Sequence, residues 1–282
     1  WSNSSAWKST YQLPVSMEDF TSYKSRLKST TKQLSSSIIN NNNDNDNVTN
    51  IPVFYNLYVS SEGNDEDVTA AASEKFRVEN LVVDQLKQLD PHVHYPVYVN
   101  SIGQQLSIPG TVQLGHYGEG QETLTLHSLW NHCQHHRHQQ NARVVYLHSK
   151  GALHDREEND ILRSFVTAGA TSPKCTNNLL VDKCDVCSIR FTPFPHPHVS
   201  GNMWSARCQY IAQLPDPFVF ADMMETVRRV KTARRDYHVG RRRFAVEHWV
   251  HSHPNVLPCD VYTGNFTCGY DGARAELDND ID

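Results

Sequence analysis

Polar residues with the chemistry to bind a ligand follow directly after an apolar run in the middle of this chain. Residues 144–147 are typical of a buried strand, and His148, Ser149, Lys150 and Gly151 come immediately after them. In open α/β sheets, ligands bind in the crevice at the carboxyl ends of the strands, so a site is expected at this position. The alternative is a strand that leaves the sheet into a solvated turn.

A helix is predicted just beyond this polar loop. Residues 155–158 have the acid-x-x-Glu form of a capping box, and apolar residues then recur on one helical face at positions 161, 162, 165 and 166. Helix N-termini carry unsatisfied N–H groups and partial positive charge, so this end could receive an anion alongside Lys150. A well-capped surface helix without a ligand is the alternative.

Two further stretches carry residues suited to binding or acid–base chemistry. In residues 200–204, small residues precede Trp204, whose ring offers a stacking face for a sugar or a base, and a helix is expected to run from this stretch to residue 214. Glu247 lies among aromatic and apolar neighbours, which favour a raised proton affinity and make it a candidate acid or base. An ion pair with residues 241–243, which are all arginines, is the alternative.

The chain contains 16 histidines, a number that raises the question of a metal site. His132, His135, His136 and His138 have spacings that could bind a transition metal. The cluster runs into residues 139–141 without a nearby acid to orient the imidazoles, which favours a solvated helix end, and no HExxH motif is present. We therefore assign no metal ligands.

The elements that would position these residues alternate between strands and helices. Strands are predicted at residues 51–59, 97–99, 112–114 and 143–147, with amphipathic helices at about 78–89 and 122–136. This order predicts an α/β fold with a mostly parallel sheet flanked by helices. Residues 1–50 are rich in Ser, Thr and Asn and are interpreted as a disordered stem or linker, whereas residues 264–282 form an acidic tail.

Composition and charge limit the kinds of partner. The 282 residues with 38% hydrophobic content can bury one substantial core. The net charge of -5 argues against nucleic acid, because binding to phosphate backbones needs a basic face. No apolar stretch is long enough to span a bilayer, so a membrane anchor is expected only in a segment outside this chain.

Cysteines and sequons indicate the secretory pathway. Asn265 begins a sequon inside the loop between Cys259 and Cys268, which suggests a disulfide-closed loop in the lumen of the Golgi or the endoplasmic reticulum. Cys184 and Cys187 form a CxxC pair that could also hold zinc, although the second pair of a zinc ribbon is missing.

Taken together, three motifs resemble a family of glycosyltransferase-like domains from algae, protists and bacteria, with a His-Ser/Thr-Lys element also seen in rhamnan-synthesis-type proteins. The motifs are residues 146–151, residues 200–204 and the segment 244–249 with Glu247 and Trp249. Residues 55–56 and 122–124 are similar to that family as well, and the resemblance covers roughly residues 51–263.

The resemblance implies a GT-A-like domain that moves a sugar from a nucleotide-sugar donor to a glycan or glycoprotein acceptor. Most GT-A enzymes hold a divalent metal, Mn²⁺ or Mg²⁺, on the diphosphate with an Asp-x-Asp motif, but here His148, Ser149 and Lys150 stand in its place. A direct role for Lys150, with His148 and Gly151 beside it, in neutralising the diphosphate is therefore expected.

The resemblance also implies the remaining site residues. Those near the nucleotide would be Tyr55 and Asn56, those near the donor sugar and acceptor would be Ser200, Gly201, Asn202, Trp204 and Trp249, and the catalytic base would be Glu247, with Asp155 as second choice. Two other functions stay open: a non-catalytic glycan-binding domain of the same fold, and a metal-dependent hydrolase that uses the His-rich segments.

Overall fold

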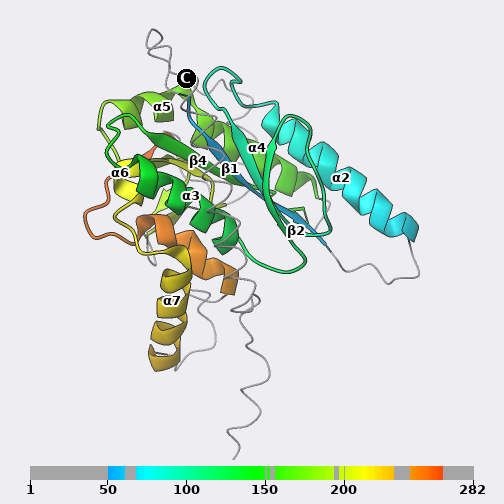
Figure 1. Ribbon diagram of the computed structural model, residues 1–282. Coiled ribbons are helices and arrows are strands. Elements are labelled where there is room, and N and C mark those ends of the chain that lie inside the picture. Colours follow the sequence, from blue (N-terminus) through cyan, green and yellow to red (C-terminus); the bar gives the residue numbers. More distant parts are fainter. Residues whose placement is uncertain are drawn as a thin grey trace, which may run out of the picture.

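The structure is a computed structural model that describes residues 50–60, 68–149, 151–152, 156–193, 197–199, 201–231 and 242–262. The alternating order predicted for the first half is confirmed (Figure 1). Its elements are β1 (Val53–Val59), α2 (Val68–Leu86), β2 (Val97–Gly103), β3 (Val112–Tyr117), α3 (Thr123–His136) and β4 (Arg143–His148).

The second half contains shorter elements. They are α4 (Glu157–Thr171), α5 (Pro173–Leu180), β5 (Val186–Ser188), β6 (Phe191–Thr192), β7 (His198–Val199), β8 (Trp204–Arg207), α6 (Cys208–Ile211), α7 (Pro217–Lys231), the 3-10 helix η1 (Arg242–His251) and β9 (Pro258–Asp260). Helix α4 begins two residues after Asp155, with Arg156 at its N-cap and no side-chain cap bond. The first residue of the predicted capping box, Asp155, lies outside the described residues.

One seven-stranded sheet runs through the domain in the order β3-β2-β1-β4-β8-β5-β9. The first four strands are parallel to one another, β8 is antiparallel to both of its neighbours, and β5 and β9 are parallel to each other. The sheet is therefore mostly parallel, with a Rossmann-like half at β3-β2-β1-β4 and a mixed half beyond β4. The expected α/β class is confirmed.

Helices cover both faces of the sheet, and each face has its own apolar core. On one face α2, α4 and α5 pack over side chains such as Val53, Tyr55 and Leu147. On the other face α3, α6, α7 and η1 pack over side chains such as Phe54 and Tyr146. The apolar residues of the parallel strands are buried because both faces are covered, as expected for a parallel sheet.

Residues 199–214 differ from the helix predicted for them. Residues 204–207 form β8, which pairs with β4 from Tyr146↔Trp204 to Arg143↔Arg207, and helix α6 begins only at Cys208. The four residues of β8 are too few for their pattern to separate strand from helix. Pairing with β4 on one side and β5 on the other decides the strand.

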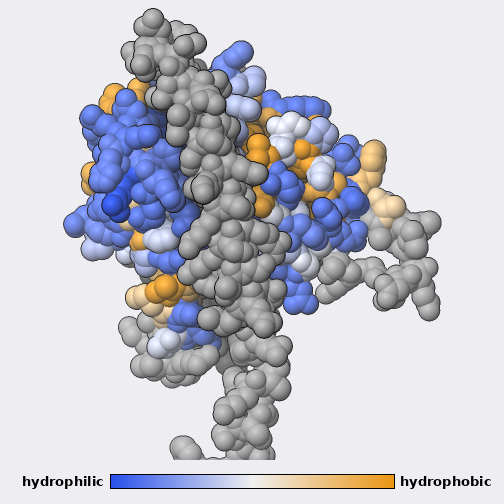
Figure 2. All heavy atoms as spheres, viewed as in Figure 1, coloured by the Kyte–Doolittle hydropathy of each residue, from blue (hydrophilic) through white to orange (hydrophobic). Residues whose placement is uncertain are grey.

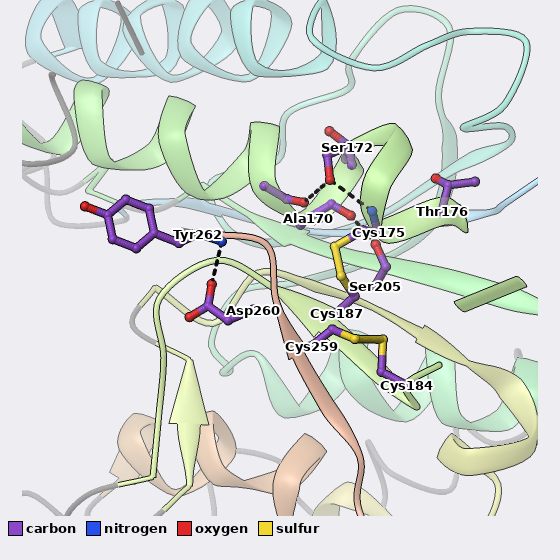
Figure 3. Close-up of a disulfide and its surroundings, with 12 residues drawn as sticks. Ala170, Ser172, Cys175, Thr176, Cys184, Cys187, Ser205, Cys259, Asp260 and Tyr262 are labelled. Carbon is purple, nitrogen blue, oxygen red and sulfur yellow. Dashed lines mark hydrogen bonds between the residues drawn. A yellow bond between two sulfur atoms is a disulfide. The ribbon is translucent and has the colours of Figure 1, made fainter. Parts of the chain in front are cut away.

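Three disulfides link elements of the described structure, and they correct the pairing suggested by the sequence. Cys133 pairs with Cys208, joining α3 to α6, and Cys175 pairs with Cys187. Cys184 pairs with Cys259, so the expected loop closed by Cys259 and Cys268 is wrong (Figure 3). Both cysteines of the CxxC are used in disulfides, which removes the zinc alternative for them.

The disulfides also bear on the cellular environment. Such bonds persist in extracellular and secretory compartments, so the protein belongs to an oxidising environment. Figure 2 shows that the described surface on this face is largely hydrophilic, with hydrophobic residues in small separate groups. Within the described residues, no helix is long and apolar enough to cross a membrane.

The disulfides should differ in their contribution to stability, because the loops they close differ in length. The bonds Cys133–Cys208 and Cys175–Cys187 join residues 75 and 12 positions apart. We expect the double variant Cys133→Ala, Cys208→Ala to lower the free energy of unfolding by about 4 kcal/mol, and the matched variant Cys175→Ala, Cys187→Ala by about 3 kcal/mol. Urea unfolding followed by circular dichroism measures both, and a larger loss from the shorter loop would contradict this account.

Candidate functional site

The candidate site lies in the parallel half of the sheet, at the point where successive strands change from one side of β1 to the other. From β1 the chain adds β2 and β3 on one side, and then crosses to add β4 on the other side of β1. Such a switch point leaves a crevice at the carboxyl ends of the two central strands. His148 ends β4 there, and the loop that contains Gly201 and Asn202 enters β8 at the same edge, because β8 is antiparallel to β4.

Glu122 is the residue around which this site is assembled. It directly precedes α3, and its Oε2 accepts hydrogen bonds from the Tyr146 hydroxyl at 2.9 Å and from the Asn202 Nδ2 at 2.7 Å. Its Oε1 lies 3.6 Å from the Nδ1 of His148. Three segments of the chain thus meet at one carboxylate: the start of α3, the end of β4 and the loop before β8.

The phenol of Tyr146 is un-ionised in this arrangement. Its side chain is fully buried, and burial first, then the negative charges of Glu122 and Glu247, raise the pKa of the phenol well above its usual value. The hydroxyl therefore keeps its proton and donates a hydrogen bond to Glu122. Its ring stacks on the ring of His148, with 6.2 Å between centroids and an angle of 11° between planes.

A row of polar contacts continues from Glu122 along α3 into the sheet. Thr125 donates its hydroxyl to the Asn56 Oδ1 at 2.8 Å, and the Asn100 Nδ2 donates to the Ser128 hydroxyl at 3.0 Å. Asn56 faces both Asn100 and His148 in the strand register. Positions 122, 125 and 128 of the α3 segment therefore contact β4, β1 and β2 in turn, which fits the spacing of one helical face.

The loop before β8 contains two consecutive residues with positive φ angles. Gly201 has φ of +99° and Asn202 has φ of +46°, in a region that glycine and asparagine adopt more readily than other residues. The Gly201 carbonyl lies 2.7 Å from the Nε2 of His148. Both polar atoms of the Asn202 side chain are hydrogen-bonded. Its Nδ2 donates to Glu122, and its Oδ1 accepts from the Trp204 indole N–H at 3.1 Å.

The stacking face predicted for Trp204 and the place near the donor sugar and acceptor predicted for Trp249 do not fit the positions of these residues. Both indoles are fully buried and lie 6.2 Å apart between ring centroids, and Trp249 donates its ring N–H to the Pro215 carbonyl at 2.8 Å. No ring face is left for a sugar. These tryptophans support the site from inside the core.

The position of Tyr55 likewise does not fit the place near the nucleotide that was predicted for it. Tyr55 is fully buried on the opposite face of the sheet from the site, where its hydroxyl donates to Gln85 at 2.7 Å. Burial raises its pKa far above the usual value. Asn56 lies on the face of the sheet that carries the site, but it is 4% exposed and its side chain is bonded to Thr125. It therefore helps to orient the site from the interior of the protein.

The turn after β4 is held at both ends. Ser149 donates its N–H to the Asn56 carbonyl, its hydroxyl accepts from the Tyr58 N–H at 2.9 Å, and its carbonyl accepts from the Ala152 N–H. Gly151 has φ of +77°, and a Cβ there would lie 2.5 Å from that of Asn159, so a larger residue would not fit. Three predicted site residues lie outside the described residues: Lys150, Asp155 and Ser200.

A side chain of α2 also stabilises the turn after β4. Arg77 donates to the Ala152 carbonyl, and the Glu74 carboxylate holds the guanidinium in place through hydrogen bonds of 2.8 to 2.9 Å. The sequence offered no signal for this contact, since the two partners are separated by 75 positions.

Glu247, the first choice for the catalytic base, lies in η1 and is half-buried. Its negative charge is one of those that raise the pKa of Tyr146. Its role stays a prediction.

The histidine cluster on α3 does not have the features of a metal site. His132 stacks on His136 with 4.1 Å between centroids, and burial first, then the charges of His136 and His135, lower its pKa to about 3. The Nδ1 atoms of His135 and His136 face carbonyls of their own helix. Among the described residues, no group of three or more His, Cys, Asp or Glu side chains could hold a metal ion.

Fold and site together define an α/β protein with a Rossmann-like half and a polar site at the switch point of its sheet. The chain belongs to the family described as a domain of unknown function (DUF8361), which matches residues 54–279. Comparisons with curated proteins and with solved structures gave no significant match.

Glu122 and Tyr146 are the residues of this site that were not assigned from the sequence. Both belong to stretches that entered the family resemblance, but neither was given a role. A signal for Glu122 was present: it is an acid at the start of a helix, directly after a Gly-rich turn at residues 115–120. An acid in that position projects toward the carboxyl edge of a parallel sheet.

His251, at the end of η1, should make stability depend on pH. It is 5% exposed, both ring nitrogens lack a hydrogen-bond partner, and burial first, then His198 and His248, lower its pKa to about 3. The unfolded chain takes up this proton near pH 6.5, so the free energy of unfolding should fall as the pH decreases from 6.5 to 3, by about 1.4 kcal/mol per pH unit for one such group.

The substitution His251→Gln should reduce this slope by about one proton in urea titrations at several pH values. His138→Gln, at an exposed position, is the matched control and should leave the slope unchanged. An unchanged slope in His251→Gln would contradict the burial of this imidazole as an uncharged group.

Proposed function

We propose that this domain is a GT-A-like glycosyltransferase, which moves a sugar from a nucleoside diphosphate donor to a hydroxyl of a glycan or glycoprotein. One observation carries the proposal: His148, Glu122 and the Gly201–Asn202 turn meet at the switch point between β1 and β4. Ligands bind at this place in open α/β sheets. The division of the sheet into a parallel half and a mixed half also suits separate binding of donor and acceptor.

The chemistry of the β4 end suits the departure of a diphosphate. As the bond between the anomeric carbon and the diphosphate breaks, the electron pair stays on the leaving oxygen, and negative charge grows there. Lys150 is predicted to neutralise this charge, together with His148, because cationic donors aimed at a developing oxyanion stabilise it strongly in a site shielded from water.

The acceptor hydroxyl must lose a proton when it attacks the anomeric carbon. In an inverting transfer a carboxylate takes this proton, and Glu247 is the proposed base, with Asp155 as second choice. The effect of its negative charge on the pKa of Tyr146 supports this choice. The three disulfides support placing the reaction in the lumen of the Golgi or endoplasmic reticulum.

The variant Lys150→Ala should abolish transfer and leave the fold intact. Removing one group that stabilises a developing oxyanion typically lowers turnover by about a hundredfold to a thousandfold. Release of nucleoside diphosphate from a panel of nucleotide-sugars, with manganese or with EDTA, measures this effect, and circular dichroism checks the fold. Lys183→Ala, at an exposed position away from this loop, is the matched control.

Two outcomes would count against the proposal. Turnover like that of the wild type in Lys150→Ala would remove the diphosphate role of that residue. Absence of donor binding in calorimetry across the whole panel would favour the non-catalytic glycan-binding alternative.

A further inference from the structure

The hydrogen bonds of His148 fix where its ring protons lie. The Gly201 carbonyl can only accept, so the Nε2 of His148, at 2.7 Å from it, must carry a proton. A neutral imidazole with its proton on Nε2 has a lone pair on Nδ1. The charge state of His148 therefore depends on what faces Nδ1.

The group that faces Nδ1 is the carboxylate of Glu122. Its Oε1 is 3.6 Å away, and its Oε2 accepts from Tyr146 and Asn202. Two donors on one oxygen stabilise the ionised form of a carboxyl group. A lone pair on Nδ1 would then be repelled by Glu122, whereas a proton on Nδ1 makes the contact attractive.

We propose that His148 is held as an imidazolium between the Gly201 carbonyl and the Glu122 carboxylate, and that Glu122 is a positioning residue that keeps this cation at the carboxyl end of β4. The ligand class is a diphosphate, and this identity rests on the proposed function. Glu122 itself does not touch the donor in this scheme. It sets the charge and the orientation of the ring that does.

The surroundings of His148 come from several elements and agree with a retained positive charge. Tyr146, two residues earlier on β4, presents a neutral ring that stacks on the imidazole. Glu247 on η1 adds a second negative charge near that tyrosine. The His148 side chain is 12% exposed, so it is shielded from most of the solvent but stays open to a ligand.

The charge state can be read directly by NMR. Long-range ¹H–¹⁵N spectra of the oxidised domain with ¹⁵N-labelled histidine distinguish the two neutral tautomers from the imidazolium, and the signals that vanish in His148→Gln assign the residue. We expect His148 to be protonated on both nitrogens at pH 7.5. A spectrum of a neutral ring would overturn the proposal, and the wild-type protein alone decides this point.

The variant Glu122→Gln tests the positioning role. It removes the negative charge but keeps a side chain of the same size, so His148 should lose its Nδ1 proton at lower pH than in the wild type and keep the proton on Nε2. Glu119→Gln, an exposed acid of the same turn, is the matched control and should leave the titration of His148 unchanged. An equal titration in Glu122→Gln and the wild type would overturn the role of Glu122.

A binding measurement separates this inference from the proposed function. Calorimetry with inorganic pyrophosphate and with uridine diphosphate at pH 7.5 should show binding about tenfold weaker in Glu122→Gln than in the wild type, as expected when one charge-assisted hydrogen bond is lost. If the imidazolium is present but neither probe binds, the charge state of His148 stands and the diphosphate role fails. If both probes bind equally to wild type and Glu122→Gln, the positioning role fails.

Discussion

The position of α3 over the sheet is the constraint on which the site depends. Thr125 and Ser128 reach down from the helix to two buried asparagines on neighbouring strands, so their polar atoms find partners only in one register of helix and sheet. A buried polar group left without a partner costs about 1 to 3 kcal/mol, which is more than one such bond contributes when it is formed. These contacts therefore specify where α3 lies more than they add to stability. The same register places Glu122, one turn before Thr125, at the end of β4.

The second half of the domain is held by covalent links as well as by packing. Strands β5, β8 and β9 have three or four residues each, and such short strands bury little area on their own. The disulfide Cys184–Cys259 ties the residues before β5 to β9, and Cys133–Cys208 ties the end of β8 to α3. The loop that contains Gly201 and Asn202 is therefore fixed on the side of β8 as firmly as His148 is fixed on the side of β4.

The parts of this structure that the sequence predicted are those with a strong local pattern. The apolar runs of β1 and β4 and the 3.6-residue period of α3 are enough to indicate a mostly parallel sheet covered by helices. The parts that it missed depend on contacts between distant residues. Trp204 was assigned to a helix and to a ligand because its neighbours are small, but pairing with Tyr146 puts it in a strand and in the core. Tyr55 and Asn56 are adjacent in β1 and so point to opposite faces, and only the packing of α2 and α3 decides which face holds the site.

The arrangement of the two carboxylates near Tyr146 separates their roles. Glu122 has one oxygen that accepts two hydrogen bonds and the other beside the ring of His148. A catalytic base must lie within hydrogen-bond reach of the proton that it takes, so a carboxylate surrounded by three of the protein's own side chains is less suited to that role. Glu247 lies on a different element, η1, and its negative charge also raises the pKa of Tyr146. In the proposed function, Glu122 would therefore position His148, and proton transfer would be left to a second carboxylate.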